Sequence, residues 1–186
     1  MSTNEQQKMI KKISKLLSLA LRHQPEALNI ELDGQGWTDT STLILAVNKH
    51  GISLDLELLK KVVQENDKQR FAFNKDHSCI RANQGHSVNI DLQLNPTTPP
   101  EFLYHGTVAK FMGSIKEQGL LKMNRQHVHL SPDVETAQNV GSRRGKPVIL
   151  TIATGQMHQA GHEFLLSKNN VWLTDHVPAD YILFKE

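Results

Sequence analysis

The stretch LQLNPTTPP, residues 92–100, decides how the chain is organised, because it holds three prolines and no charged side chain. Prolines fix φ and lack a backbone N–H, so a segment of this composition is typical of an extended linker. A chain of 186 residues is long enough to place a small domain on each side of it. We therefore predict two lobes, residues 1–93 and residues 94–186.

Before the linker, apolar residues recur at helical spacing in three segments. These segments are residues 5–23, 43–47 and 56–63. Pro25 disfavours a helical conformation at the residue before it, so the first helix is expected to end near Arg22 and His23. Ser53 is a candidate N-cap for the third helix.

The runs RFAF (70–73) and CIRA (79–82) alternate apolar and polar residues around the polar segment 74–78, which predicts a β-hairpin. Three helices followed by a hairpin is the order of elements in a winged-helix module, a common nucleic-acid scaffold. Element order alone does not establish binding.

After the linker, short apolar runs alternate with polar segments. The runs are FLYH, HVHLS, PVILTIAT, VWLT and YILF. One helix is expected at residues 109–118, where Gly119 would end it. The chain is thus predicted to be an α+β protein with a mostly β second lobe.

Positive charge is concentrated in two segments. Residues 1–23 and 105–150 each carry four more basic than acidic side chains, although the formal net charge of the chain is only +2. This distribution suits a partner that carries phosphate, and the alternative for either segment is a solvated surface.

The composition also bears on location. No apolar run is long enough to span a bilayer, and the opening residues lack the apolar stretch of a signal peptide. The single cysteine, Cys79, excludes a disulfide framework within the chain. We therefore expect a cytoplasmic monomer that does not engage a membrane.

Two polar segments of the first lobe are candidates for anion binding. Arg22 and His23 follow a basic helix, whose dipole favours a cationic histidine at its C-terminal end, although they could simply cap the helix. RANQGHS (81–87) follows the hairpin, and backbone N–H groups together with Ser87 could bind one phosphate there. An ordinary polar loop is the alternative.

The second lobe offers three candidates. In YHGT (104–107), a glycine would permit close approach of a ligand to the backbone. HVHLS (127–131) places two histidines on one strand face, but no third metal ligand is evident, so we expect no metal site. The arginines of SRRGKP (142–147) suit phosphate, or lie in a solvated turn.

Familiar catalytic patterns are missing from the sequence. It contains no GxSxG, HExxH, P-loop or GxGxxG motif. What remains is a site of arginine, histidine and small polar groups, which would bind and stabilise anions.

ALRHQPE, NDKQRF, IRANQGHS, FLYHGT, HVHLS and the basic loop before VILTI occur in this order. Together they resemble the bacterial members of the RNA 2'-phosphotransferase family, from about residue 10 to the C-terminus. The resemblance implies a winged-helix RNA-binding lobe at residues 1–93 and an NAD-binding lobe of the ADP-ribosyltransferase type at residues 94–186.

The resemblance also implies the site residues. The catalytic set falls on Arg22, His23, Arg70 and Arg143, where Arg143 is preferred to Arg144 by counting back from the strand VILTI. The NAD contacts fall on His105, Gly106, Thr107, His129 and Ser131. The RNA-phosphate contacts fall on Arg81, Gln84, Gly85, His86 and Ser87.

The implied reaction consumes NAD as co-substrate and acts on a tRNA-like RNA that bears a 2'-phosphate. That phosphate attacks the NAD ribose and expels nicotinamide, and a ribose hydroxyl then attacks phosphorus to give ADP-ribose 1'',2''-cyclic phosphate. No metal is required, because arginines can neutralise the charge. The alternatives are an ADP-ribosyltransferase that leaves ADP-ribose on a phosphate and a winged-helix binding protein without activity.

Overall fold

The computed structural model describes residues 3–66 and 68–184, which form two compact units, Met1–Gln93 and Leu94–Glu186. Each unit has its own apolar core. No helix in the described ranges is long and apolar enough to cross a membrane.

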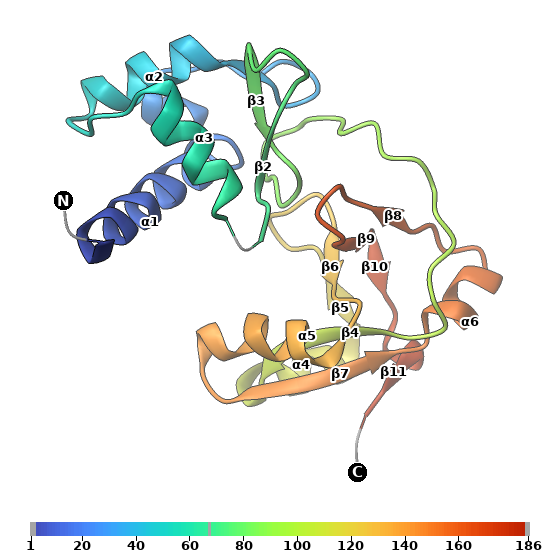
Figure 1. The fold of residues 1–186 in the computed structure, drawn as a ribbon. Helices are drawn as coiled ribbons and strands as arrows, with labels where there is room; N and C mark the ends of the chain where they lie inside the picture. The colour runs from blue at the N-terminus through green and yellow to red at the C-terminus, as the bar shows by residue number, and fades with distance from the viewer. Residues whose placement is uncertain (1–2, 67, 185–186) are drawn as a thin grey trace. The chain divides into compact units, whose positions relative to one another are not determined.

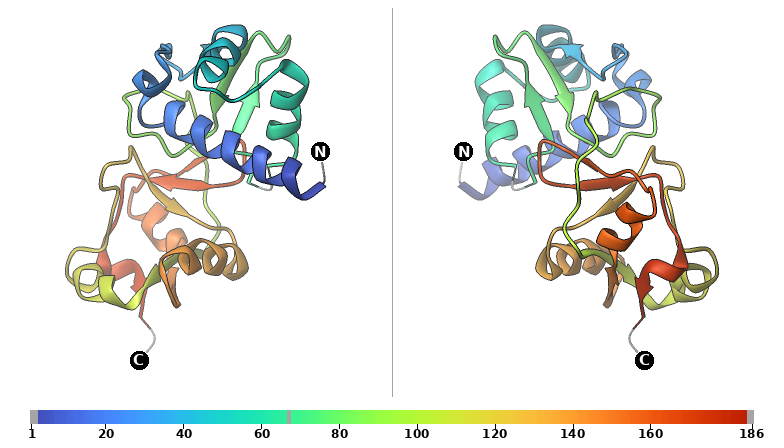
Figure 2. Two further views of the ribbon diagram at one scale, coloured as in Figure 1. Left: turned by 90° about the vertical axis from the view of Figure 1, so that its left-hand side faces the viewer. Right: turned by 90° about the vertical axis from the view of Figure 1, so that its right-hand side faces the viewer.

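The first unit contains the three predicted helices, shown in Figures 1 and 2. They are α1 (Thr3–Ala20), α2 (Thr40–Lys49) and α3 (Leu56–Gln64), with a short 3-10 helix at Pro25–Leu28. Regular helix ends at Ala20, and the next three residues form a turn in which the N–H of His23 donates to the carbonyl of Leu19. The expected end of this helix is therefore three residues too late.

Aspartates begin the second and third helices. The carboxylate of Asp39 accepts from the N–H of Thr42 at 2.7 Å, and that of Asp55 from the N–H of Leu58 at 2.8 Å. The prediction that Ser53 caps α3 is wrong, because Asp55 immediately precedes the helix, has the extended backbone of an N-cap and accepts from the N–H of Leu58.

The predicted hairpin is confirmed. It comprises β2 (Phe71–Phe73) and β3 (Cys79–Ala82), paired so that Phe71 lies opposite Ala82. A short strand β1 (Thr38–Asp39) adds to the other side of β3, giving the order β1-β3-β2. Ile80 is fully buried and joins the sheet to the core that the three helices share.

The second unit contains two three-stranded sheets and one pair of strands. The first sheet has the order β11 (Ile182–Leu183), β7 (Pro147–Ile152), β4 (Leu103–Val108), and the second β6 (Val128–Leu130), β9 (Trp172–Thr174), β8 (Leu165–Leu166). β5 (Leu120–Leu121) pairs with β10 (His176–Val177). Tyr104 and Ser131 exchange two backbone hydrogen bonds of 2.9 and 2.7 Å, which link the edge of the first sheet to the end of β6.

The second unit is more helical than predicted. The expected helix is present as α4 (Met112–Gln118) after a 3-10 turn, and Gly119 ends it with a φ of 73°. The structure adds α5 (Val134–Gly141) and α6 (Thr154–Gln159), and the basic loop contains a 3-10 turn at Ser142–Arg144. α5 packs against β4 and β7, as Figure 1 shows. The α+β class is confirmed.

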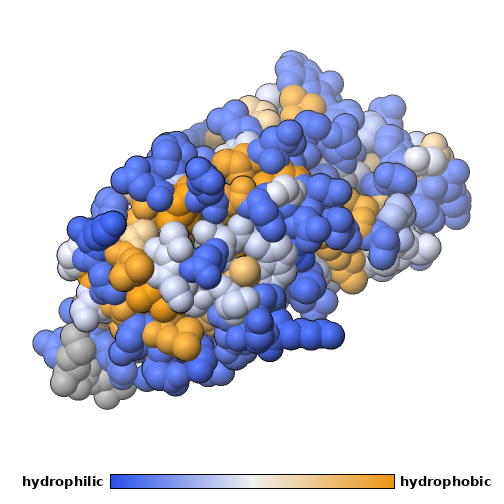
Figure 3. Space-filling model, turned by 90° about the horizontal axis from the view of Figure 1, so that it is seen from above, coloured by the Kyte–Doolittle hydropathy of each residue, from blue (hydrophilic) through white to orange (hydrophobic). Residues whose placement is uncertain are grey.

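Seen from above, the molecular surface is largely hydrophilic, and its apolar atoms lie in separate patches (Figure 3). Polar surface between such patches is the usual pattern for a chain that meets water.

Candidate functional site

In the first unit, the turn after α1 meets the RANQGHS turn (residues 81–87). The backbone N–H groups of Ser87 and Val88 both donate to the carbonyl of Arg22, at 2.9 and 3.3 Å. The Nδ1 atom of His23 lies 2.9 Å from the Ser87 hydroxyl oxygen. Residues 64 positions apart in the sequence therefore share one hydrogen-bonded cluster.

Gly85 lies beside the Arg22 guanidinium: a Cβ atom at this position would be in ordinary van der Waals contact with it, 3.6 Å from Nη1 and 3.7 Å from Cζ. Packing therefore leaves room for a side chain. Gly85 has a φ of 89°, which L-residues with a side chain rarely adopt, and this explains a glycine in the RANQGHS turn.

Two of the predicted RNA-phosphate contacts are buried. Arg81 is only 6% exposed: its guanidinium stacks 4.5 Å above the Trp37 ring and donates to the carbonyl of Gln35 at 3.2 Å. His86 is 1% exposed. Both side chains are therefore largely covered in this conformation, whereas Gln84 is half-buried and Ser87 is exposed. Exposure of this kind depends on packing and could not be read from the motif.

Burial, together with the positive charges of Arg22, His23 and Arg81, lowers the pKa of His86 to about 3. Neither ring nitrogen of His86 has a hydrogen-bond partner within the described part of the chain. The folded protein therefore keeps this ring neutral at neutral pH, while the unfolded chain takes up a proton below pH of about 6.5.

The first prediction follows from this difference. Because only the unfolded state binds the proton between about pH 6.5 and 3, stability must fall as pH falls through that range. From pH 7 to 5 the loss is about 2 kcal/mol for this histidine. Urea unfolding at both pH values should show that loss for the wild-type protein relative to His86→Phe. His50→Gln, which removes an exposed imidazole from the same unit, should behave like the wild-type protein. A pH dependence that His86→Phe leaves unchanged would contradict the assignment.

Arg70 immediately precedes β2 and is tied to the RANQGHS turn through the main chain, since its carbonyl accepts from the N–H of Asn83 at 2.8 Å. Its Nη1 donates to Oδ1 of Asn66 at 3.0 Å. The Asn66 amide in turn donates to the hydroxyl of Ser14 on α1, also at 3.0 Å. The guanidinium is thus oriented by α3's C-terminal segment and by α1.

In the second unit, His105 and His129 are neighbours. The Nδ1–H of His105 donates to the carbonyl of His129 at 3.0 Å. Burial lowers the pKa of His105, against the opposing effect of that hydrogen bond. The ring is then neutral with its proton on Nδ1, which leaves Nε2 as a hydrogen-bond acceptor. Ser131 is joined to the same strand through Tyr104.

Gly106 has a structural role that the sequence did not predict. A Cβ atom there would overlap the carbonyl oxygen of Ala137 and lie 2.9 Å from the backbone nitrogen of Gly141. The space beside this glycine is therefore filled by α5 and not by a ligand. Since Tyr104 bonds Ser131 along the strand edge, alternation turns the N–H and C=O of Gly106 to that same edge.

The second prediction is that Gly106→Val destabilises the fold, and does not simply restrict the approach of a ligand to the backbone. The added side chain must displace the α5 backbone, so we expect a loss of at least about 2 kcal/mol of stability. Gly113→Ala is the matched control, because a Cβ atom there meets nothing within 4 Å and the residue lies in α4. Thermal unfolding should show a marked fall for Gly106→Val and no fall for Gly113→Ala. Equal unfolding temperatures for Gly106→Val and the wild-type protein would refute this packing role.

Two arginines act on His105, and the sequence analysis assigned neither of them to the site. The positive charges of Arg144 and Arg125 each lower the pKa of His105. Partial desolvation, and secondarily the charge of Arg144, lowers the pKa of Arg125, although the residue as a whole is exposed at the surface. The Arg144 guanidinium lies 5.9 Å from the Phe111 ring. Arg125, two residues before the HVHLS motif, belonged to a basic segment but to no motif that we singled out.

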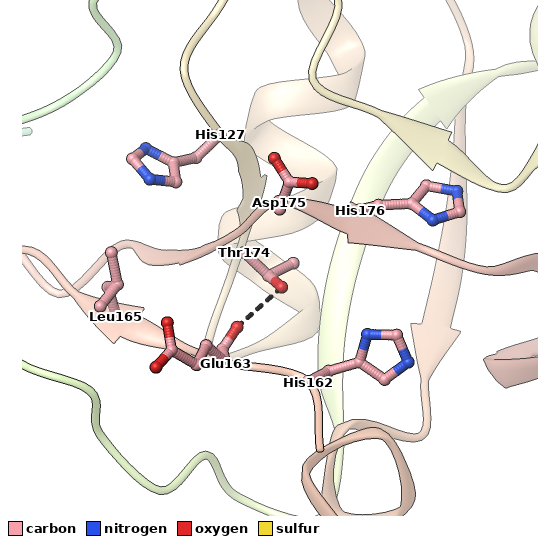
Figure 4. Close-up of a pocket in the computed structure, with 7 residues that line it drawn as sticks. All are labelled: His127, His162, Glu163, Leu165, Thr174, Asp175 and His176. Carbon is pink, nitrogen blue, oxygen red and sulfur yellow. Dashed lines mark hydrogen bonds between the residues drawn. The ribbon is translucent and has the colours of Figure 1, made fainter. Parts of the chain in front are cut away.

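A pocket of about 330 Å³ lies elsewhere in the second unit (Figure 4). It is lined by His127, His162, Glu163, Leu165, Thr174, Asp175 and His176. The imidazole of His127 points away from those of His162 and His176 in Figure 4. Among the described residues no three His, Cys, Asp or Glu side chains are grouped as metal ligands.

Comparison with known proteins gives concordant matches over nearly the whole chain. The model of the family described as "RNA 2'-phosphotransferase, Tpt1 / KptA family" matches residues 8–176. A probable RNA 2'-phosphotransferase of Flavobacterium johnsoniae is 59% identical over 175 residues, 94% of this chain and 96% of that protein. One from Burkholderia pseudomallei is 54% identical over 171 residues, 92% of this chain and 93% of that protein.

Proposed function

Because this chain belongs to the RNA 2'-phosphotransferase family, and is thus a transferase of phosphorus-containing groups, we propose that it removes an internal 2'-phosphate from RNA with NAD as consumed co-substrate. The observation that carries the proposal is the cluster of Arg22, His23 and Ser87. The backbone N–H of Ser87 donates to the Arg22 carbonyl and the Ser87 hydroxyl lies 2.9 Å from Nδ1 of His23, so an arginine, a histidine and a hydroxyl come together at one turn.

One unit binds RNA and the other binds NAD. Residues 1–93 are an RNA-binding winged-helix domain, a reading supported by three helices followed by a hairpin in a three-stranded sheet. Residues 94–186 are an NAD-binding domain of the ADP-ribosyltransferase type, which acts in the cytoplasm on a tRNA-like RNA. The protein works as a monomer.

The phosphate site of the first unit consists of Arg22, His23 and Arg70. Arginine supplies a guanidinium fork that matches phosphate oxygens. Ser87 and Gln84 are the accessible side chains of the RANQGHS turn, and the Arg22 guanidinium lies beside Gly85 of that turn. Of the three catalytic side chains, only His23 exchanges a proton readily near neutral pH.

The chemistry proceeds in two steps. The ionised RNA 2'-phosphate attacks C1'' of the NAD ribose, and nicotinamide leaves as a neutral molecule, so alignment is the chief requirement. O2'' of the same ribose then attacks phosphorus and breaks its bond to the RNA 2'-oxygen. The products are 2'-hydroxyl RNA and ADP-ribose 1'',2''-cyclic phosphate. Arginine and His23 stabilise charge that moves among phosphate oxygens in the second step.

The NAD site of the second unit consists of His105, Gly106, Thr107, His129 and Ser131. The residues present fit such a ligand: the unprotonated Nε2 of His105 can accept from a ribose hydroxyl. The backbone groups of Gly106 that face the strand edge suit an amide. The charges of Arg125 and Arg144 beside His105 suit a pyrophosphate. Arginines neutralise charge throughout, so the reaction proceeds without metal.

The decisive experiment incubates the protein with NAD and an RNA oligonucleotide that bears one internal 2'-phosphate, and follows every product by mass spectrometry. We expect free nicotinamide, 2'-hydroxyl RNA and the cyclic phosphate in equal amounts. RNA that keeps ADP-ribose, with no cyclic phosphate, would instead identify an ADP-ribosyltransferase. If no nicotinamide is released and NAD does not shift the unfolding temperature, the protein is a nucleic-acid-binding protein without this activity.

A further inference from the structure

Arg81 is a buried cation in the first unit. It leaves the middle strand of the sheet, β3, and its guanidinium is held by the Trp37 ring at 4.5 Å and by the Gln35 carbonyl at 3.2 Å. Its Nε atom has no hydrogen-bond partner among the described residues. Within the same residues, no carboxylate forms a salt bridge with it.

Arg81 belongs to one cluster of positive groups. The segment Gln35–Gly36 lies between Arg81 and His86, since the Gln35 carbonyl accepts from the Arg81 guanidinium and a Cβ atom on Gly36 would lie 3.6 Å from Nε2 of His86. The charges of Arg22, His23 and Arg81 all act on the buried ring of His86. Asp33 is the carboxylate whose charge acts on Arg81. It is exposed, and its Oδ1 accepts from the N–H groups of Gln35 and Trp37 at 2.8 and 2.9 Å, which fixes the turn that holds Arg81.

Such an arrangement is costly for a protein without a ligand. A guanidinium removed from water and left without an ion pair loses hydration that neighbouring cations cannot replace. An apolar side chain of similar volume would fill the same space at less cost. The positive charge gains a favourable partner once an anion binds to the exposed part of the cluster, because the interior screens charges poorly.

We propose that Arg81 is a fixed positive charge that strengthens binding of the RNA 2'-phosphate at Arg22, His23 and Ser87 from inside the unit, without touching it. This inference rests on the proposed function, since it takes the 2'-phosphate as the anion. Arg81 is thus a specificity-determining residue: its charge favours RNA that carries the extra phosphate over RNA with a 2'-hydroxyl.

The test compares two RNA oligonucleotides of one sequence, one with a single internal 2'-phosphate and one with a 2'-hydroxyl at that place. Their Kd values are measured by fluorescence anisotropy without NAD, at fixed ionic strength. The ratio of the two values isolates the contribution of the 2'-phosphate. Arg81→Met removes the charge while keeping an elongated apolar side chain, and Arg81→Lys keeps the charge without the guanidinium fork.

Asp33→Asn should change the preference for 2'-phosphorylated RNA in the opposite direction to Arg81→Met. Asparagine can accept the same two backbone hydrogen bonds, so the turn is retained while one negative charge is lost. This variant does not depend on whether Arg81→Met folds. Thermal unfolding of each protein verifies that it is folded at the assay temperature.

We expect Arg81→Met to reduce the preference for 2'-phosphorylated RNA on the order of tenfold, because one charge is removed from a poorly screened site. Arg81→Lys should keep most of the preference. Asp33→Asn should increase it by about twofold, a smaller effect because an exposed charge is screened by water and salt.

The failures are distinguishable. If the wild-type protein itself does not prefer the 2'-phosphorylated RNA, the proposed function fails. If it does, and neither Arg81→Met nor Asp33→Asn changes the ratio, the inference about Arg81 fails alone. Equal losses in Arg81→Met and Arg81→Lys would show that the shape of the guanidinium matters and its charge does not. An Arg81→Met protein that does not fold leaves the decision to Asp33→Asn, where an unchanged or smaller ratio overturns the proposal.

Discussion

ADP-ribosylated RNA is expected to accumulate when Arg70 is replaced by alanine. In the proposed reaction the first step needs two bound reactants in line, while the second moves negative charge among phosphate oxygens. A guanidinium that acts mainly in the second step can be removed without abolishing the first. Loss of one such donor slows the affected step on the order of a hundredfold or more. The measurement is a mass spectrum of the RNA at short times with NAD in excess.

The geometry of Arg70 supplies the controls. Its guanidinium is oriented by Asn66, so Arg70→Lys should not restore the rate, because an ammonium cannot reproduce two parallel donors. Lys68→Ala removes an exposed cation from the same segment and should leave the product pattern unchanged. If Arg70→Ala slows both steps in proportion and no ADP-ribosylated RNA is detected, Arg70 does not act selectively in the second step.

Much of the fold could be predicted because its signals are local. Proline content marked the boundary between the units, helical spacing marked α1 to α3, and alternation marked the hairpin. α5 gave no such signal, because it is eight residues long and only half of them are apolar or glycine. Its position is explained by contact with the backbone of β4 at Gly106, which only the folded chain reveals.

The candidate site, too, could be predicted only in part from the sequence. The resemblance assigned the Arg22–His23 pair and the RANQGHS turn to one site, which stays a prediction, and the structure joins the two segments by hydrogen bonds. That Arg81 and His86 lie beneath the surface depends on Trp37 and on a glycine at position 36, whose hypothetical Cβ atom would lie 3.6 Å from the His86 ring. Those contacts connect segments about fifty residues apart in the sequence. A local sequence pattern cannot predict such contacts.

The second large loss of activity is expected from replacing an arginine of the second unit. The sequence assigned this role to Arg143, and that assignment stays a prediction. The charges that reach His105 are those of Arg125 and Arg144. We therefore expect Arg125→Ala to lower the rate of 2'-phosphate removal on the order of a hundredfold, because a guanidinium held near the reacting groups stabilises charge that moves among phosphate oxygens.

Arg144→Ala should cost less, since its guanidinium also lies near the Phe111 ring and Arg125 remains in place. Arg143→Ala is the matched comparison, because it removes the same kind of side chain from the same 3-10 turn. Initial rates at saturating NAD and RNA rank the three alanine variants. Thermal unfolding of each variant checks that it is folded. If Arg143→Ala loses the most and Arg125→Ala little, counting from the strand identified the right residue. The charges around His105 would then serve to hold the pyrophosphate, and Arg125→Ala should raise the KM for NAD while leaving kcat intact.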